Sequence, residues 1–150
     1  MRRLAALVIL FGGCAAPERA KAPDPAEAEV LDAVRAMYAD LSARRWDAFE
    51  AHFLPEASLT FAGKDGPRKQ SAAEFIRIVS KKLEGKEIFS ERMKEGSARV
   101  HGNVAHVWSK FEGQEGSTGQ VRTWSGVDAY TLFKAAGRWK IAAIAVSYDP

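Results

Sequence analysis

Residues 104–148 read VAHVWSKFEGQEGSTGQVRTWSGVDAYTLFKAAGRWKIAAIAVSY, and this segment gives the strongest indication of the fold. It holds three runs rich in β-branched and aromatic residues, Val104–Glu112, Gly119–Lys134 and Trp139–Tyr148, which short glycine-containing turns separate. Runs of this composition between glycine turns are typical of consecutive antiparallel strands. We therefore predict a three-stranded meander in this part of the chain.

An amphipathic helix is predicted upstream of the meander. Asp24-Pro25 is typical of a helix start, and we expect the helix to extend to about Arg44. Its apolar residues recur at helical spacing and form a single face: Val30, Leu31, Val34, Met37, Tyr38 and Leu41. A long helix packed against a curled antiparallel sheet predicts a cone with a hollow interior. Such a hollow can hold a small molecule.

The residues between this helix and the meander predict shorter elements. In chain order these are a second helix over Trp46–Leu54 that stops at Pro55, a short strand over Ser58–Phe61, a turn-rich loop over Gly63–Pro67, a third helix over Ala72–Leu83, and two weak strands around Gly96. Ser71 and Glu74 have the spacing of a capping box at the start of the third helix. Lys64, Arg68 and Lys69 are expected in a solvated loop.

The composition is that of an ordinary globular domain. The 150 residues suffice for one domain with a core, and 47% hydrophobic with 27% charged residues is usual for such a domain. The formal net charge of +3 includes Arg2 and Arg3, without which 20 basic residues face 19 acidic ones. Because nucleic-acid binding requires a concentrated basic face, this balance gives no indication of a nucleic-acid partner.

The N-terminal residues are predicted to be an export signal. Met1–Arg3 is a charged start, and Leu4–Phe11 is an apolar run too short to span a bilayer. Residues 11–14, FGGC, resemble a bacterial lipobox, although Phe11 stands where an aliphatic residue is usual. Cys14 is the only cysteine, so lipidation accounts for a thiol that has no disulfide partner within the chain. We predict a lipoprotein signal peptide over residues 1–13; the alternative is an uncleaved signal anchor.

Residues 14–25 are predicted to form a flexible tether between the lipid and the folded domain. Pro17, Pro23 and Pro25 recur in a segment of small and charged residues that cannot form a packed element. The domain itself would span residues 26–150. We expect it to be exported and anchored to the bacterial membrane through Cys14. The outer membrane or the periplasmic face is favoured, because Ala15 is not an acidic retention signal.

The order of these elements resembles the nuclear transport factor 2-like superfamily, and within it the SnoaL-like group. The resemblance covers about residues 26–148 and is carried by two motifs, Arg45–Phe49 (RWDAF) and Gly137–Ile141 (GRWKI). It implies an α+β fold, a conical curved antiparallel β-sheet packed on a long N-terminal helix and two shorter helices, also called a cystatin-like cone. It further implies an apolar pocket and frequent homodimers through the outer sheet face. Because the superfamily includes both enzymes and proteins without known chemistry, the fold alone does not fix the function.

The steroid isomerases of this superfamily indicate where catalytic residues would lie. They use a tyrosine on the first helix, an aspartate base on the first strand and a protonated aspartate on a later strand. The resemblance places these positions at Met37 (beside Tyr38), Phe61 and Asp128. Only Asp128 matches, and it is the candidate catalytic residue, as a proton donor or acceptor. Burial would raise its pKa if it points inward; the alternative is a place at the rim, or an ion pair with an arginine such as Arg122.

The histidines give little indication of a general base. We expect His52 late on the second helix as a packing residue, and His101 in a solvated turn. Matching strand parity to the isomerases places His106 and Trp108 on the outer sheet face, where an exposed tryptophan indicates a dimer interface. No spacing of His, Asp or Glu resembles a metal site, and we predict neither a metal nor a cofactor.

Several elements are expected to contribute to the pocket. Its candidate residues are Tyr38, Phe61, Phe75, Val107, Ser109, Phe111, Trp124, Asp128 and Tyr130, and Tyr148 is a further aromatic candidate. Most aromatic residues at such spacing belong to a core. A structural domain whose cone is filled by its own side chains is therefore an alternative.

The predicted function is binding. We expect a membrane-tethered, extracytoplasmic domain that binds a small apolar or amphipathic molecule in its cone, or that acts as a dimeric interaction module, without evident catalysis. The competing hypothesis is a ketosteroid-isomerase-like isomerase or lyase that acts on a small hydrophobic substrate through Asp128. The enzyme ranks second because two of the three isomerase positions, Met37 and Phe61, cannot transfer protons.

Overall fold

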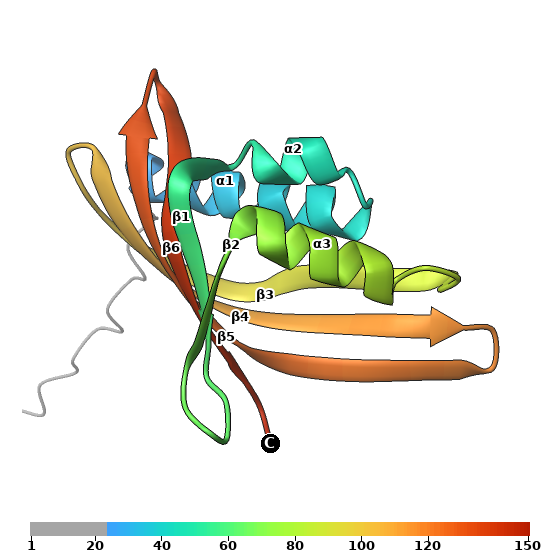
Figure 1. Cartoon of the computed structure of the whole chain (residues 1–150). Coiled ribbons are helices and arrows are strands. Elements are labelled where there is room, and N and C mark those ends of the chain that lie inside the picture. Colours follow the sequence, from blue (N-terminus) through green and yellow to red (C-terminus); the bar gives the residue numbers. More distant parts are fainter. Residues whose placement is uncertain (1–23) are drawn as a thin grey trace, which may run out of the picture.

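The computed structural model describes residues 24–150 (Figure 1). The predicted signal peptide, the lipidation site Cys14 and nearly all of the predicted tether lie outside the described residues. Within residues 24–150, no helix is long and apolar enough to cross a membrane.

Three helices form where the sequence supplies caps and apolar faces. They are α1 (Pro25–Ser42), α2 (Trp46–Glu50) and α3 (Ala72–Lys82). Asp24 caps α1 by accepting a hydrogen bond from the Ala26 amide at 2.9 Å, and Pro25 occupies the first turn, where its missing amide proton costs nothing. The predicted capping box of α3 is present, with Ser71 and Glu74 each bonded to the other's backbone amide.

The described residues form one six-stranded sheet in the order β2-β1-β6-β5-β4-β3. The strands are β1 (Phe53–Phe61), β2 (Arg68–Ser71), β3 (Ile88–His101), β4 (Val104–Ser117), β5 (Gln120–Ala135) and β6 (Arg138–Tyr148). All neighbouring strands are antiparallel except β1 and β6, which are parallel. The predicted meander is therefore confirmed as β4–β5–β6, and a further long strand, β3, lies at its edge.

The helices lie together on one side of the strongly bent sheet (Figure 1). α1 packs along β3, and α3 packs against β1. The buried face of α1 consists of the six residues that helical spacing predicts, Val30, Leu31, Val34, Met37, Tyr38 and Leu41. The opposing sheet face supplies the rest of the core, including Ala105, Val107, Phe111, Tyr130, Leu132, Trp139, Ile141 and Ile144. The interior of the cone lies between these two faces.

Three expected boundaries are wrong. The second helix ends at Glu50, because Phe53 already pairs with Ile141 of β6; Pro55 fits this strand because the pairing shifts register between Phe53 and Ser58. His52 therefore lies in the turn between α2 and β1 and not on a helix.

The other two errors concern the edges of the sheet. Residues 88–101 form one continuous strand with a bulge between Met93 and Glu95, where two weak strands were expected. Arg68 and Lys69, expected in a loop, belong to β2, which pairs with β1. Charged residues are tolerated at such an edge because their side chains reach solvent.

Candidate functional site

A buried carboxylate lies at the centre of the cone. Asp128 is on β5, where it pairs with Ser109 of β4 and Val146 of β6, and it is only 5% exposed. The expected alternatives for this residue, a place at the rim or an ion pair with an arginine, are not what the structure shows. Its hydrogen-bonding partners are the hydroxyls of Tyr38 from α1 and Tyr130 from β5.

Both tyrosines donate to the same oxygen of Asp128. The distances to Oδ2 are 2.5 Å from the Tyr38 hydroxyl and 2.9 Å from the Tyr130 hydroxyl. The Ser109 hydroxyl lies 3.5 Å from the Tyr38 oxygen and completes the network. The other carboxylate oxygen, Oδ1, is buried and has no hydrogen-bonding partner. Because an unpartnered buried carboxylate oxygen is costly, Oδ1 is the atom at which this site is incomplete.

The surroundings of Asp128 alter its acidity and that of its partners. Burial raises the pKa of Asp128 to about 6, while the hydrogen bonds from Tyr38 and Tyr130 oppose this shift by stabilising the anion. Burial, together with the charge of Asp128, also raises the pKa of both tyrosines, which therefore remain protonated donors. The arrangement holds a carboxylate that is mostly ionised at neutral pH and whose free oxygen can accept a hydrogen bond.

A second carboxylate reaches the same interior from β3. The Trp124 indole N–H donates to Glu91 Oε2 at 3.0 Å. Gly113 lies between these residues in the cross-strand register, and a Cβ there would come within 2.4 Å of the indole ring. The absence of a side chain at Gly113 thus allows the indole to lie flat and reach Glu91. Burial, with a contribution from the charge of Asp128, raises the pKa of Glu91 to about 7.

Two small adjoining cavities connect these groups. The inner cavity has a volume of about 40 Å³, and its lining residues are Met37, Tyr38, Leu41, Phe49, Leu59, Phe61, Phe75, Glu91, Asp128, Tyr130, Ile144, Val146 and Tyr148. The outer cavity has a volume of about 70 Å³, and its lining residues are Leu41, Phe75, Val79, Lys82, Phe89, Glu91, Glu115, Arg122, Trp124 and Tyr148. They share Leu41, Phe75, Glu91 and Tyr148, so the two cavities adjoin along these residues.

The cavity volumes limit what the cone can hold as it stands. A cavity of about 40 Å³ exceeds the roughly 15 Å³ needed for a water but is far below the roughly 300 Å³ of a drug-sized pocket. A ligand is therefore either a few heavy atoms in size or displaces aromatic side chains at the mouth. The cavity lies where the sequence predicts a hollow lined by aromatic residues, but its empty volume is small.

The structure brings together most of the predicted pocket residues. Tyr38, Phe61, Phe75, Asp128 and Tyr130 line the inner cavity, and Trp124 lines the outer one.

Three predicted pocket residues belong to the core instead. Val107, Ser109 and Phe111 are buried on the same sheet face, but they do not line either cavity. The reason is clearest for Phe111, whose ring lies over Gly126 and meets Tyr148 edge-on at 5.8 Å between ring centres. Glu91 was missed in the sequence because β3 was not recognised as a continuous strand.

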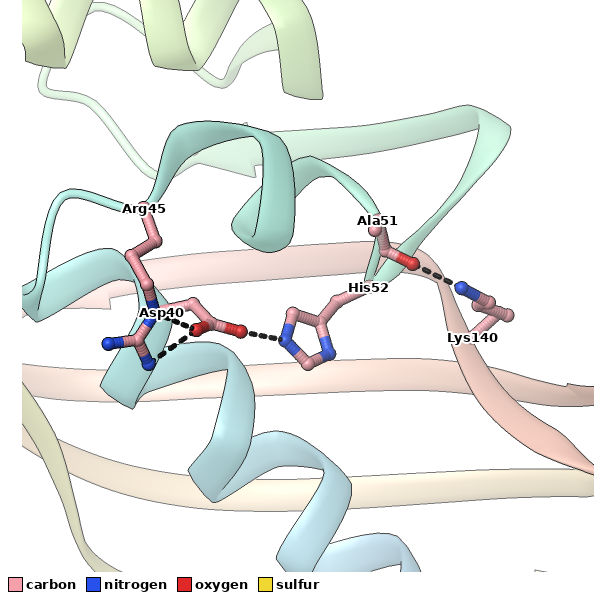
Figure 2. A network of polar contacts seen from close by, with 5 residues as sticks. All are labelled: Asp40, Arg45, Ala51, His52 and Lys140. Atoms are coloured by element: carbon pink, nitrogen blue, oxygen red, sulfur yellow. Dashed lines mark hydrogen bonds and ion pairs between the residues drawn. The ribbon is translucent and has the colours of Figure 1, made fainter.

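A second polar network lies on the other side of α1 (Figure 2). Asp40 Oδ2 is 2.6 Å from His52 Nε2, and its Oδ1 accepts hydrogen bonds from Arg45 at 2.8 Å and 2.6 Å. Lys140 contacts the Ala51 carbonyl beside this pair. Burial raises the pKa of Asp40, but the bonds from His52 and Arg45 outweigh burial and hold the pKa below its ordinary value. Both oxygens of Asp40 have partners, so the network ties α1 to the α2–β1 turn.

The outer face of the sheet carries the predicted dimer residues. Trp108 is 56% exposed, and His106 is exposed beside it on β4. Together with Ala129 of β5 and Ala143 and Ala145 of β6 they line a shallow groove of about 380 Å³. These residues lie on the opposite face of the sheet from Asp128. In residues 24–150 no group of three His, Cys, Asp or Glu side chains is arranged to hold a metal ion.

Comparison with solved structures places this fold among conical domains. The β subunit of benzoate 1,2-dioxygenase from Burkholderia mallei matches with a TM-score of 0.71 and 14% identity over 86% of this chain and 93% of that chain. A ketosteroid isomerase-like protein from Erwinia carotovora atroseptica matches with a TM-score of 0.65 and 21% identity over 85% and 99% of the two chains.

A third structure comes from Xanthomonas campestris and is described as a candidate calcium/calmodulin-dependent protein kinase II association domain. It matches with a TM-score of 0.66 and 16% identity over 87% of this chain and 94% of that chain. At these identities the three structures show a shared fold alone.

Sequence comparison assigns the family. A search of curated protein sequences finds no match. The family model for the SnoaL-like domain matches residues 30–149, which include every strand and most of α1. The predicted α+β cone and the predicted family are thereby confirmed. The chain belongs to the SnoaL-like domain family.

Proposed function

We propose that this domain binds a small amphipathic molecule inside its cone, with the polar end of the molecule at Asp128. The observation that carries the proposal is the buried carboxylate of Asp128, which lines a cavity of mainly apolar and aromatic residues and whose Oδ1 has no hydrogen-bonding partner. A ligand that donates a hydrogen bond to Oδ1 would satisfy this atom while its apolar part contacts rings such as Phe61 and Phe75.

The access route also supports binding. The outer cavity adjoins the inner one at Glu91, and its lining includes the charged side chains of Lys82, Glu115 and Arg122. Phe61 and Phe75 are stacked at 6.0 Å between ring centres at the inner cavity, and Phe75 reaches the outer cavity too. Rotation of such rings is the expected way for the cone to admit a ligand larger than its present volume.

Isobutanol is a suitable probe for this proposal, since it pairs one hydroxyl donor with a small branched apolar body. We expect it to shift the NMR signals of the Leu59, Ile144 and Val146 methyl groups in a saturable way, because these side chains line the inner cavity. The methyl groups of Val30 and Val34, which are core residues outside the lining, serve as internal controls. Equal, non-saturating shifts at both sets of methyl groups would contradict binding in the cone.

The outer sheet face supports a second part of the proposal, a homodimer. Trp108 and His106 flank a groove floored by small residues, and one structurally similar protein is described as an association domain. Trp108→Ala is expected to weaken self-association, because an exposed indole on a sheet typically gains its contacts from a partner. Sedimentation of the parent and the variant at several concentrations measures the effect. Identical sedimentation of the parent and the variant would exclude this face as the dimer interface.

Membrane attachment is proposed on the sequence alone. The lipobox-like residues 11–14 support lipidation of Cys14, and the proline-containing residues after it support a tether. Cys14→Ser should release the protein from the membrane fraction of a bacterial cell. Unchanged retention of the variant in that fraction would rule out the lipid anchor.

Proton transfer is the second candidate function. Asp128 and Glu91 line one cavity, and both have pKa values raised toward neutrality, as is common for groups that exchange protons during catalysis. An isomerase or lyase would use Asp128 as proton donor or acceptor. The test is deuterium incorporation at the α-carbon of a small β,γ-unsaturated ketone in D₂O. Incorporation that persists unchanged in Asp128→Asn would exclude this role.

A further inference from the structure

We propose that the polar end of the bound molecule is a protonated amine. This inference rests on the proposed binding function and adds the chemical class of the ligand. It stands on which hydrogen-bonding groups face the cavity, on the balance of charge around it, and on its aromatic lining.

The first argument is that the hydroxyl and indole donors that contact the two cavity carboxylates are already engaged. Tyr38 and Tyr130 both donate to Oδ2 of Asp128, and Trp124 donates to Oε2 of Glu91. An indole N–H can only donate, so the Trp124 contact defines Glu91 as an acceptor. Oδ1 of Asp128, buried within the site, remains without a partner. Asp128 and Glu91 both line the inner cavity, so its lining offers two acceptor carboxylates and favours a ligand with hydrogen-bond donors.

The second argument is charge. The linings of the two cavities include three acidic residues, Asp128, Glu91 and Glu115. They include two basic residues, Lys82 and Arg122. Lys82 is engaged with Glu115 at 3.0 Å, so the excess negative charge lies toward Asp128 and Glu91. One positive charge on a ligand would balance the lining, whereas an anion would be repelled by two carboxylates.

The third argument is the nature of the surrounding rings. Trp124 already has two cations near its ring, Lys82 at 5.9 Å and Arg122 at 5.8 Å from the ring centre. Phe61 and Phe75 supply further aromatic surface to the inner cavity. Aromatic faces stabilise ammonium groups when water is excluded, and an ammonium brings three donors to two carboxylates. An alcohol would bring a single donor and could not donate to both carboxylates.

Three probes with nearly the same apolar body test the inference: isobutylammonium, isobutanol and isobutyrate. Titrations of the full chain at a pH of about 8, where both carboxyls are largely ionised, follow the cavity methyl groups and the Trp124 indole N–H by NMR. We expect isobutylammonium to bind about tenfold more tightly than isobutanol, because its hydrogen bonds to carboxylate are charge-assisted. Isobutyrate should not bind detectably.

Two isosteric variants locate the preference. Asp128→Asn and Glu91→Gln should each abolish most of the preference for the amine over the alcohol, and the second variant keeps the test valid should the first fold poorly. Glu95→Gln is the matched control, because Glu95 is an exposed acidic residue of the same strand as Glu91, paired with Lys110 at 2.9 Å. It should bind isobutylammonium as the parent does.

The outcomes separate this inference from the function on which it rests. If isobutanol binds as tightly as isobutylammonium or more tightly, the assignment of the ligand as an amine is overturned, and the proposed binding function stands. Absence of binding by all three probes would overturn both. A preference for isobutylammonium that survives in both Asp128→Asn and Glu91→Gln would also overturn the inference, because the amine would then be held elsewhere.

Discussion

Two aspartates near the same helix show how differently one side chain can be used. Asp40 faces outward from α1 and is partly exposed, and His52 and Arg45 occupy both of its oxygens (Figure 2). Asp128 faces the opposite side of the same helix, is buried, and has two donors on one oxygen and none on the other. Asp40 therefore joins α1 to the α2–β1 turn, whereas Asp128 keeps one oxygen without a hydrogen-bond donor, and a ligand can supply that donor.

The pKa values of the two aspartates shift in opposite directions, because the balance between burial and hydrogen bonds to the anion differs between the two sites. Partners that stabilise the anion lower the pKa of Asp40 below its ordinary value despite the cost of burial. At Asp128 burial prevails over the two tyrosine bonds and raises the pKa to about 6. A histidine and an aspartate within hydrogen-bonding distance therefore do not by themselves identify the functional site. The more informative sign is a buried carboxylate that the fold leaves incompletely paired.

The largest expected effect concerns the pH dependence of stability. The folded protein holds the Asp128 proton up to about pH 6, whereas the unfolded chain releases it near 3.8, so the contribution of this carboxyl to stability falls as pH rises between these values. The difference corresponds to about 3 kcal/mol. Asp128→Asn should remove this decline. Urea unfolding of parent and variant at several pH values measures the pH dependence of the unfolding free energy. Parallel pH profiles would contradict a buried Asp128 with a raised pKa.

Gly113→Ala tests the second interior carboxylate. The added methyl group would meet the Trp124 ring, force the indole away and break its bond to Glu91. We expect a loss of about 2 kcal/mol in unfolding free energy, typical of overpacking, together with a change in the Trp124 indole N–H signal. An unchanged indole signal would show that the ring does not depend on Gly113.

Tyr38→Phe tests the donors that hold Asp128. Removing one hydrogen bond to an ionised carboxylate should raise the Asp128 pKa further, by roughly one unit. Tyr130→Phe is the companion variant and should act in the same direction, because its hydroxyl donates to the same oxygen at 2.9 Å. Carboxyl NMR titration gives both values. A lowered pKa in either variant would mean that the hydroxyl does not donate to Asp128.

The smallest effect is expected for the network of Asp40, His52 and Arg45. Asp40→Asn should cost about 1 kcal/mol of unfolding free energy at neutral pH, since its partners are partly solvated. The folded-state pKa of Asp40 is lowered, so the stability it contributes exists above its unfolded pKa and is lost as the pH falls. Parent and variant should therefore converge in acid. A deficit that remains at low pH would indicate a packing defect instead of a lost ion pair.

The sequence predicted the architecture well because local signals were strong. Apolar spacing identified the buried face of α1, capping chemistry identified the start of α3, and glycine turns delimited β4, β5 and β6. These features depend on residues close together in the chain. The parallel pairing of β1 with β6 depends on distant residues and left no local signal.

The site was predicted less completely, for identifiable reasons. Asp128 stood out as a carboxylate on an apolar strand face. The resemblance to isomerases places the helix position at Met37, but the hydroxyl that meets Asp128 belongs to its neighbour Tyr38. At this level of similarity the sequence pattern does not distinguish helix positions that are one residue apart. Glu91 was hidden because the bulge between Met93 and Glu95 breaks the alternation of β3. The Asp40–His52 contact joins a helix to a turn, which the expected extension of the second helix excluded.

The most direct test is to follow the carboxyl carbons of Asp128 and Asp40 in one NMR pH titration of the protein without ligand. We expect Asp128 to titrate near pH 6 and Asp40 below its ordinary value, because only Asp128 is buried with an unpartnered oxygen. Titration of Asp128 at or below about 3.9, the usual value for an aspartate, would contradict the account. That carboxyl would then be fully paired or solvated, and the cone would have no open polar position for a ligand.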